Sequence, residues 1–156
     1  MSATPITIAY EDPESLAARA CLRAYFALLA DRIPGITTGH VPDPDPEADS
    51  FRPPKGTFLI ARTGEDVLGC VSLKLHEPKV GEIKRLWVAP AARGLGLGRR
   101  LMALVEAEAR TLGFTGLVLD TNAALTEAIA LYRASGWRDA EPYTGFPATH
   151  WFAKPL

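Results

Sequence analysis

The amino-acid sequence predicts an α/β protein built on a mixed β-sheet that is flanked by helices. Short apolar or alternating runs predict strands, and longer stretches with apolar positions three or four residues apart predict helices. Residues 57–62 and 67–76 are joined by the tight turn "TGED", which favours an antiparallel hairpin. Residues 82–88 and 116–121 enclose a predicted helix, and this strand–helix–strand order favours parallel pairing.

The N-terminal third contains a short strand, a helix and a long connection. Residues 6–10 alternate as a strand, and a helix is predicted across residues 11–33, with Asp12 as its N-cap and Pro13 at its first position. Residues 34–56 form a Pro-rich connection without periodicity. This connection carries acidic residues at alternate positions, namely Asp43, Asp45, Glu47 and Asp49. Interleaved prolines favour an extended strip, which is either a solvated loop or a negative surface that attracts cationic substrates.

The C-terminal half continues the same alternation of helices and strands. A helix is predicted over residues 98–112, ended by Gly113, and another from about 124 to 135, ended by Gly136. Two weaker strands are expected near residues 137–143 and 149–154. No internal repeat or compositional break divides the chain, so we expect a single domain over residues 1–156.

Composition excludes several classes of function. A formal net charge of −1 argues against a strongly basic nucleic-acid binder, and no apolar run or N-terminal pattern predicts a membrane span or signal peptide. Cys21 and Cys70 lie in apolar contexts, which favours free thiols and a cytoplasmic location. The scattered histidines, His40, His76 and His150, predict no metal site. The oligomeric state is left open, with a homodimer as one alternative.

The stretch "VAPAARGLGLGRRLM" at residues 88–102 points to a ligand. Three glycines, Gly94, Gly96 and Gly98, lie directly before a predicted helix, where backbone N–H groups and the positive end of the helix dipole favour an anion. The arginines around the loop are Arg93, Arg99 and Arg100. A phosphate or pyrophosphate is the expected ligand, and the alternative is a turn whose glycines only allow the helix to pack on the sheet.

Two common phosphate-binding loops do not fit this stretch. A nucleoside-triphosphate loop requires Lys followed by Ser or Thr after the last glycine, and none is present. A dinucleotide-binding loop requires a third glycine at position 99, which is arginine, although Asp120 would suit a ribose. Coenzyme A remains as the third candidate.

Here the residues carry a resemblance to a known family. "RGLGLG" matches the R/Q-x-x-G-x-G/A signature of the GCN5-related N-acetyltransferase (GNAT) superfamily, and "EAIALYRASGW" at residues 127–137 resembles the family's next segment. The resemblance implies a central mixed sheet with splayed parallel strands at the cofactor cleft, and acetyl-CoA as co-substrate. The cofactor-binding residues that it implies are Leu86, Trp87, Val88, Arg93, Gly94, Leu95, Gly96, Leu97, Gly98, Arg99 and Asn122. Asn122 enters as a substitute, because Leu125 stands where the family often has asparagine.

The strand at residues 82–88 changes phase along its length. Ile83 fits one face of the strand, whereas Leu86 and Val88 fit the opposite parity, as one inserted residue in a β-bulge would produce. The alternative is a strand with both faces buried. In the resembled family such a bulge splays the strands, the pantetheine arm pairs with the backbone around residues 86–88, and a free N–H stabilises the oxyanion of acyl transfer.

The resemblance also implies catalytic residues. Tyr132 matches the family's general acid, and the alternative for it is a tyrosine packed in the core. Glu82 lies where some members carry a general base, although a glutamate at a strand end is often a solvated surface residue. Lys84 and Arg85 are expected to be exposed charges, and Trp87 is expected to line the acceptor cleft or to pack in the core.

The sequence therefore predicts an acyl-CoA-dependent N-acyltransferase. We expect acetyl-CoA as the donor, a primary amine of a small molecule or protein as the acceptor, no nucleic-acid or membrane partner, and direct attack in a ternary complex. Neither motif contains a cysteine, so no acyl-enzyme is needed. The alternative is a non-catalytic acyl-CoA-binding regulator on the same fold.

Overall fold

Seven strands form one mixed sheet in the order β1-β2-β3-β4-β5-β7-β6 in the computed structural model, which describes residues 5–36 and 44–156. The strands are β1 (Thr7–Tyr10), β2 (Thr57–Thr63), β3 (Asp66–Glu77), β4 (Val80–Val88), β5 (Gly116–Thr121), β6 (Arg138–Asp139) and β7 (His150–Pro155). Neighbouring strands pair antiparallel except β4 and β5, which pair parallel. The predicted hairpin, parallel pair and mixed α/β architecture are confirmed.

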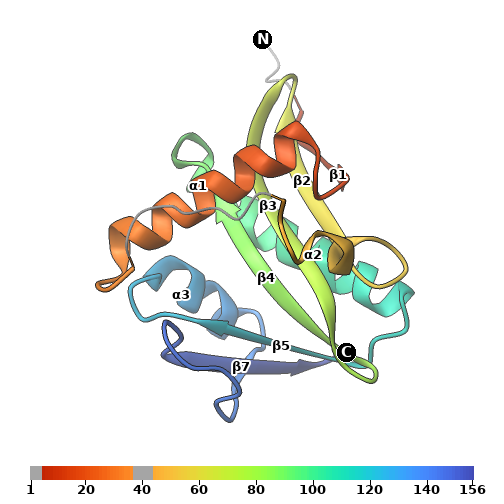
Figure 1. Cartoon of the computed structure of the whole chain (residues 1–156), viewed down its shortest axis with the longest axis vertical. Helices are drawn as coiled ribbons and strands as arrows, with labels where there is room; N and C mark the ends of the chain where they lie inside the picture. Colours follow the sequence, from red (N-terminus) through yellow and green to blue (C-terminus); the bar gives the residue numbers. More distant parts are fainter. Residues whose placement is uncertain (1–4, 37–43) are drawn as a thin grey trace.

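Helices cover both faces of this sheet (Figure 1). They are α1 (Leu16–Arg32), α2 (Leu97–Thr111), α3 (Thr126–Ala134) and the short 3₁₀ helices η1 (Ala48–Phe51) and η2 (Pro90–Ala92). Figure 1 shows α1 crossing in front of β2, β3 and β4, with α2 behind them. Gly113 follows α2 with a φ of +91° and Gly136 follows α3 with a φ of +87°, so both act as the expected helix stops. Within the described residues, no helix has the length and apolar character needed to cross a membrane.

Two hydrophobic clusters lie on opposite faces of the sheet. The larger packs Leu101, Met102 and Val105 of α2 against the strands, and the smaller packs Cys21 of α1 and Phe51 of η1 against β2 and β3. Cys21 and Cys70 are buried and unbridged, as expected. Apolar positions on one face of each helix are therefore the reason that the helices dock where they do.

The start of α1 differs from the sequence prediction. Ser15, not Asp12, is the N-cap, and its side chain accepts a hydrogen bond from the Ala18 N–H at 3.1 Å. Asp12 instead accepts the Glu14 N–H at 2.9 Å in the preceding turn and forms an ion pair with Arg52. Its carboxylate is thus held by a residue 40 positions away, and the helix begins at the next residue able to cap it.

The parallel pairing of β4 with β5 is short. It joins Val80, Gly81 and Glu82 to residues 116–118 and then ends, and Figure 1 shows the two strands diverging from that point. On the other side, Lys84 lies opposite Ser72 and Trp87 opposite Cys70, so β4 has one extra residue in this interval. The predicted bulge is confirmed.

The acidic connection is not the extended negative strip considered above. Asp43 lies outside the described residues, but Asp45 and Glu47 form ion pairs with Arg85, and Asp49 pairs with Arg52 and Lys55. Residues 48–51 form η1, where the side chain of Phe51 is buried. These carboxylates pair with the protein's own cations, so the unpaired acidic strip on which the cationic-substrate hypothesis depends is not found in the part that the structure describes.

Arg85 is likewise not an exposed charge. Only 7% of Arg85 is accessible, because the bulge turns its side chain under η1. Burial raises the pKa of Asp45, but the hydrogen bonds and charge of Arg85 outweigh burial and bring that pKa below its usual value. Sequence could not supply this pairing, since the partners lie 40 positions apart.

Candidate active site

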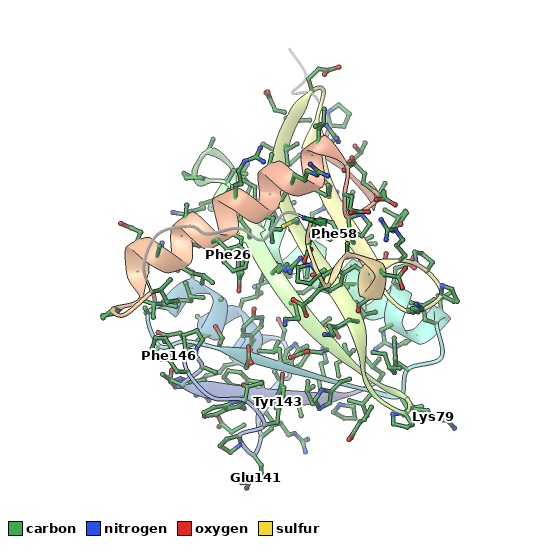
Figure 2. All side chains as sticks on the ribbon, in the orientation of Figure 1. Phe26, Phe58, Lys79, Glu141, Tyr143 and Phe146 are labelled. Atoms are coloured by element: carbon green, nitrogen blue, oxygen red, sulfur yellow. The ribbon has the colours of Figure 1, made fainter. Side chains whose placement is uncertain are left out.

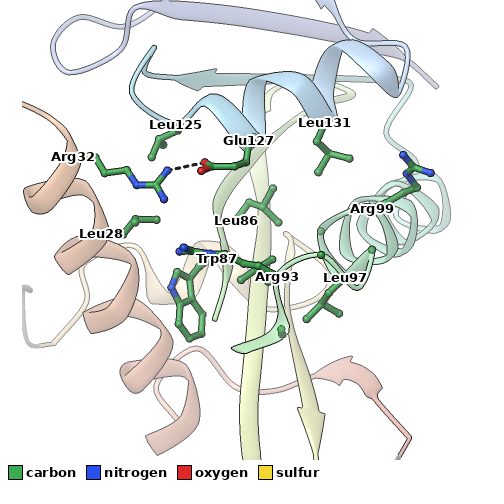
Figure 3. A pocket seen from close by; sticks show the side chains of 16 residues that line it. Leu28, Arg32, Leu86, Trp87, Arg93, Leu97, Arg99, Leu125, Glu127 and Leu131 are labelled. Atoms are coloured by element: carbon green, nitrogen blue, oxygen red, sulfur yellow. Dashed lines mark hydrogen bonds and ion pairs between the residues drawn. The ribbon is translucent and has the colours of Figure 1, made fainter. Parts of the chain in front are cut away.

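A cavity of about 420 Å³ lies beside the end of β4, beyond the part of this strand that pairs with β5. It lies among α1, β4, the loop of residues 93–98 (the glycine loop), α2 and the start of α3 (Figure 3). The residues expected to bind cofactor that line it are Leu86, Trp87, Val88, Arg93, Gly94, Gly96, Leu97, Gly98 and Arg99. A volume of this size suits a small-molecule ligand. The fold therefore gathers most of the predicted binding residues around one space.

The glycines of the loop serve two different physical needs. Gly94 and Gly96 have φ angles of +81° and +75°, which side chains rarely adopt, and a Cβ on either would meet open space. Gly98 has no such φ, but a Cβ there would lie 3.2 Å from the Leu131 side chain of α3. The first two glycines shape the loop, and the third allows close packing between α2 and α3.

The end of this loop is suited to an anion. The first hydrogen bond into α2 runs from the Arg100 N–H to the Gly96 carbonyl at 3.1 Å, so the N–H groups of residues 97–99 have no partner within the helix. Arg93 and Arg99 line the cavity, and neither forms an ion pair within the described part of the chain. Unpaired donors, positive charge and a loop without Cβ atoms together fit the pyrophosphate of a coenzyme.

Side chains from α1 and α3 complete the walls. Leu28 of α1 and Leu125, Ala128 and Leu131 at α3 form an apolar lining. Arg32 of α1 forms an ion pair with Glu127 of α3 at 2.6 Å, and Figure 3 shows this pair bridging the two helices above Leu86. Arg32 lowers the pKa of Glu127, with a smaller contribution from Arg93. Sequence analysis missed α1 here because nothing local marks it as a cavity wall.

Two residues expected to bind cofactor lie outside this lining. Leu95 is 65% exposed at the tip of the loop. The Asn122 amide donates to the Pro147 carbonyl at 2.6 Å, and its oxygen accepts from the Ala124 N–H at 2.8 Å. Asn122 thus holds the turn that follows β5, and both ends of its side chain are engaged.

Tyr132 occupies the core side of α3. It is 5% exposed, and its ring lies about 6 Å from those of Trp137 and Phe152. Burial raises the pKa of its phenol well above the usual value, and the charges of Tyr25 and Asp120 add to the effect. Tyr132 does not line the cavity, although its neighbour Leu131 does. The phenol therefore stays protonated at neutral pH.

Glu82 is not a solvated strand end. It lies inside β4, is 6% exposed, and accepts a hydrogen bond from the Tyr143 hydroxyl at 2.9 Å. Tyr143 comes from the segment between β6 and β7 (Figure 2), and its ring packs edge-on against His76. Burial and the Glu82 carboxylate raise the pKa of Tyr143. Sequence analysis missed Tyr143 because it is 61 positions away in an irregular segment.

A second carboxylate, Asp120, stands near the end of β5. It accepts the Thr144 hydroxyl at 2.6 Å, and Thr144 in turn accepts the Trp151 indole N–H at 2.9 Å. Burial, with help from Asp120, raises the pKa of Tyr25 to about 12. The divergence of β4 and β5 is therefore bordered by carboxylates and by phenols that keep their protons.

Comparison with known proteins shows that this fold is that of the acyl-CoA-dependent N-acyltransferases. The chain belongs to the acetyltransferase (GNAT) family, whose model matches residues 19–137. An IAA acetyltransferase of Azospirillum brasilense is 34% identical over 97% of this chain and 98% of its own. A proposed acyl-CoA N-acyltransferase of Klebsiella pneumoniae is 28% identical, with a TM-score of 0.76 over 97% of each chain. A Staphylococcus aureus GNAT acetyltransferase of 16% identity shares the fold, with a TM-score of 0.79 over 97% of this chain and 99% of that one.

The loop geometry predicts the effect of adding a side chain to it. Gly96→Val should weaken coenzyme A binding by about 1–3 kcal/mol, because a strained loop loses its contacts with the phosphates. Gly64→Val is the matched control, since Gly64 also has a positive φ of +59° and open space around it but lies in the β2–β3 turn. Calorimetry should find weaker binding only in Gly96→Val. Equal affinities in the two folded variants would remove the loop from the binding site.

Proposed function

We propose that the protein transfers an acetyl group from acetyl-CoA to a primary amine by direct attack in a ternary complex. One observation carries the proposal: the glycine loop and the unpaired edge of β4 border the same cavity. The loop suits the pyrophosphate, and the apolar walls suit the arm that connects it to the thioester. When bound, the thioester supplies an activated acyl group.

The backbone of β4 would hold and activate that group. Beyond Glu82, β4 has no pairing with β5, so the backbone groups on that edge are free for a ligand, and residues 86–88 line the cavity. An N–H on this edge would stabilise the negative charge that develops on the thioester oxygen. Arg93 and the N–H groups at the start of α2 would bind phosphate oxygens.

Proton transfer is assigned to two side chains. Tyr132 would donate a proton to the departing thiolate, and its buried phenol carries that proton at neutral pH. Glu82 would accept the proton of the attacking ammonium, directly or through water, from a position fixed by Tyr143. Neither cysteine borders the cavity, in keeping with direct attack.

The acceptor is proposed only as an amine, on a small molecule or a protein. Asp45, Glu47 and Asp49 do not argue for a cationic one, because they are already paired. The two buried, unbridged cysteines support a reducing, cytoplasmic setting. A regulator that binds acyl-CoA without turnover is the second candidate, since Tyr132 and Glu82 both lie outside the cavity lining.

Thiol release separates these two candidates. The protein is incubated with acetyl-CoA and a panel of amines, and free coenzyme A is followed with a thiol reagent. We expect amine-dependent thiol release together with an acetylated amine detected by mass spectrometry. Tight binding of acetyl-CoA without release for any small amine or amine-bearing peptide would favour the regulator.

Tyr132→Phe tests the general acid while keeping the core volume. The turnover rate should fall by roughly 100-fold, with little change in acetyl-CoA affinity. Because the pKa of Tyr132 is raised, its titration should cause no alkaline loss of activity below about pH 10. Tyr10→Phe, on the 41% exposed Tyr10 of β1, is the control. Wild-type turnover in Tyr132→Phe would return this residue to a packing role.

Glu82→Gln tests the general base. Activity should drop near neutral pH and recover partly at higher pH, where more of the amine is already deprotonated in solution. Glu77→Gln changes an exposed glutamate at the end of β3 and serves as the control. Parallel pH–rate profiles for wild type and Glu82→Gln would exclude Glu82 from proton transfer.

A further inference from the structure

Arg85 occupies an unusual position in β4. It sits in the bulge, with a backbone φ of +60°, a value that residues other than glycine, asparagine and aspartate seldom adopt. It is also one of the few charged residues that the fold buries, with 7% of its surface accessible. A strained backbone and a buried charge at one residue both require compensating contacts.

Those contacts come from the segment around η1. The Arg85 guanidinium donates to Asp45 at 2.7 Å and 3.3 Å and to Glu47 at 3.0 Å, and it lies over the Phe51 ring at 4.8 Å. Asp45 is itself almost fully buried, with 8% of its side chain accessible. A planar guanidinium can satisfy two carboxylates and a ring face at once, which an ammonium cannot.

The neighbouring residue shows how the bulge makes this possible. Successive side chains of a strand normally point to opposite faces. Here Lys84 and Arg85 both reach Glu47, with the Lys84 ammonium 3.3 Å and an Arg85 nitrogen 3.0 Å from its oxygens. The extra residue therefore places two consecutive cations on one face of the sheet, and Glu47 binds both.

Side chains of β3 hold the backbone of the same bulge. Ser72 donates its hydroxyl to the Lys84 carbonyl at 2.8 Å, and the Cys70 thiol donates to the Arg85 carbonyl at 3.2 Å. Both carbonyls are thus fixed by β3, while the Arg85 side chain is fixed by η1. The next residue, Leu86, begins the part of β4 that lines the cavity.

We propose that Arg85 is a positioning residue for acyl transfer, which ties the segment of Asp45–Phe51 to the β4 bulge and so aims the backbone of residues 86–88 into the cavity. The inference rests on the proposed function, because its consequence is catalytic. Arg85 is buried beneath η1, and it belongs neither to the glycine loop nor to the residues that line the cavity. Its loss should therefore affect the reacting end of the site more than the phosphate end.

Two variants separate the side chain from the backbone conformation. Arg85→Gly accepts the positive φ without strain but loses every side-chain contact, whereas Arg85→Lys keeps the charge without the planar fork. Arg52→Gly is the matched control, because Arg52 follows η1 and forms ion pairs with Asp12 and Glu14 on the surface. All are assayed at a temperature where circular dichroism shows each to be folded.

Arg85→Gly should lower kcat by about 10- to 100-fold, the loss expected when reacting groups are misplaced by an ångström or less. Coenzyme A affinity should change by less than about threefold, because the glycine loop is unchanged in this variant. Arg85→Lys should recover part of kcat, and Arg52→Gly should match wild type. Wild-type kcat in folded Arg85→Gly, or an equal loss of kcat and affinity, would overturn the proposal. Should Arg85→Gly not fold, Asp45→Asn, which removes one charge of the same pair, replaces it with the same expected pattern.

A second measurement does not depend on activity. Amide hydrogen exchange of peptides covering residues 83–89 should be faster in Arg85→Gly than in wild type and unchanged in Arg52→Gly, with α2 equally protected in all three. Unchanged exchange at residues 83–89 would overturn the positioning role. A wild-type protein that turns over no amine would instead overturn the proposed function, while the exchange result would still decide the role of Arg85.

Discussion

The separation of β4 from β5 after Glu82 is the constraint on which the rest of the site depends. Three residue pairs join the strands, and the bulge at Arg85 then changes the course of β4. Backbone groups left without partners inside a protein are costly unless a ligand or water satisfies them. Here the unpaired edge borders the cavity, and α2, which connects the two strands, brings its N-terminus to the same opening. Sheet, loop and helix therefore converge on one place as a consequence of one crossover connection.

Local features of this arrangement were predictable from sequence, because local sequence determines them. Positive φ angles at Gly94 and Gly96 favour glycine, and the phase change between Ile83 and Leu86 is visible in the order of apolar residues. Element order and parallel pairing follow from alternating strands and helices. Boundaries were less certain, since Asp12 and Ser15 are both residue types that cap helices, and the ion pair of Asp12 with the distant Arg52 is not visible in the sequence.

Side-chain partnerships across the sheet could not be predicted. Charged residues in a strand were interpreted as exposed because most are, yet Arg85 is buried by partners that come from an acidic segment 38 and 40 positions earlier. Glu82 likewise depends on Tyr143, and the Arg32–Glu127 pair joins residues 95 positions apart. In each case the information lies in the tertiary arrangement and not in spacing or composition.

The unpaired strand edges of the sheet differ in where they lie. Its outer edges are the four-residue β1 and the two-residue β6, and short edge strands offer little template for pairing with another chain. A further unpaired edge belongs to β4, inside the molecule, between α1, α3 and the glycine loop. Ligand atoms in the cavity can therefore reach backbone groups of β4 that no other strand uses. The margins of the sheet thus give a neighbouring chain little backbone to pair with, whereas its free interior edge is open to a ligand in the cavity.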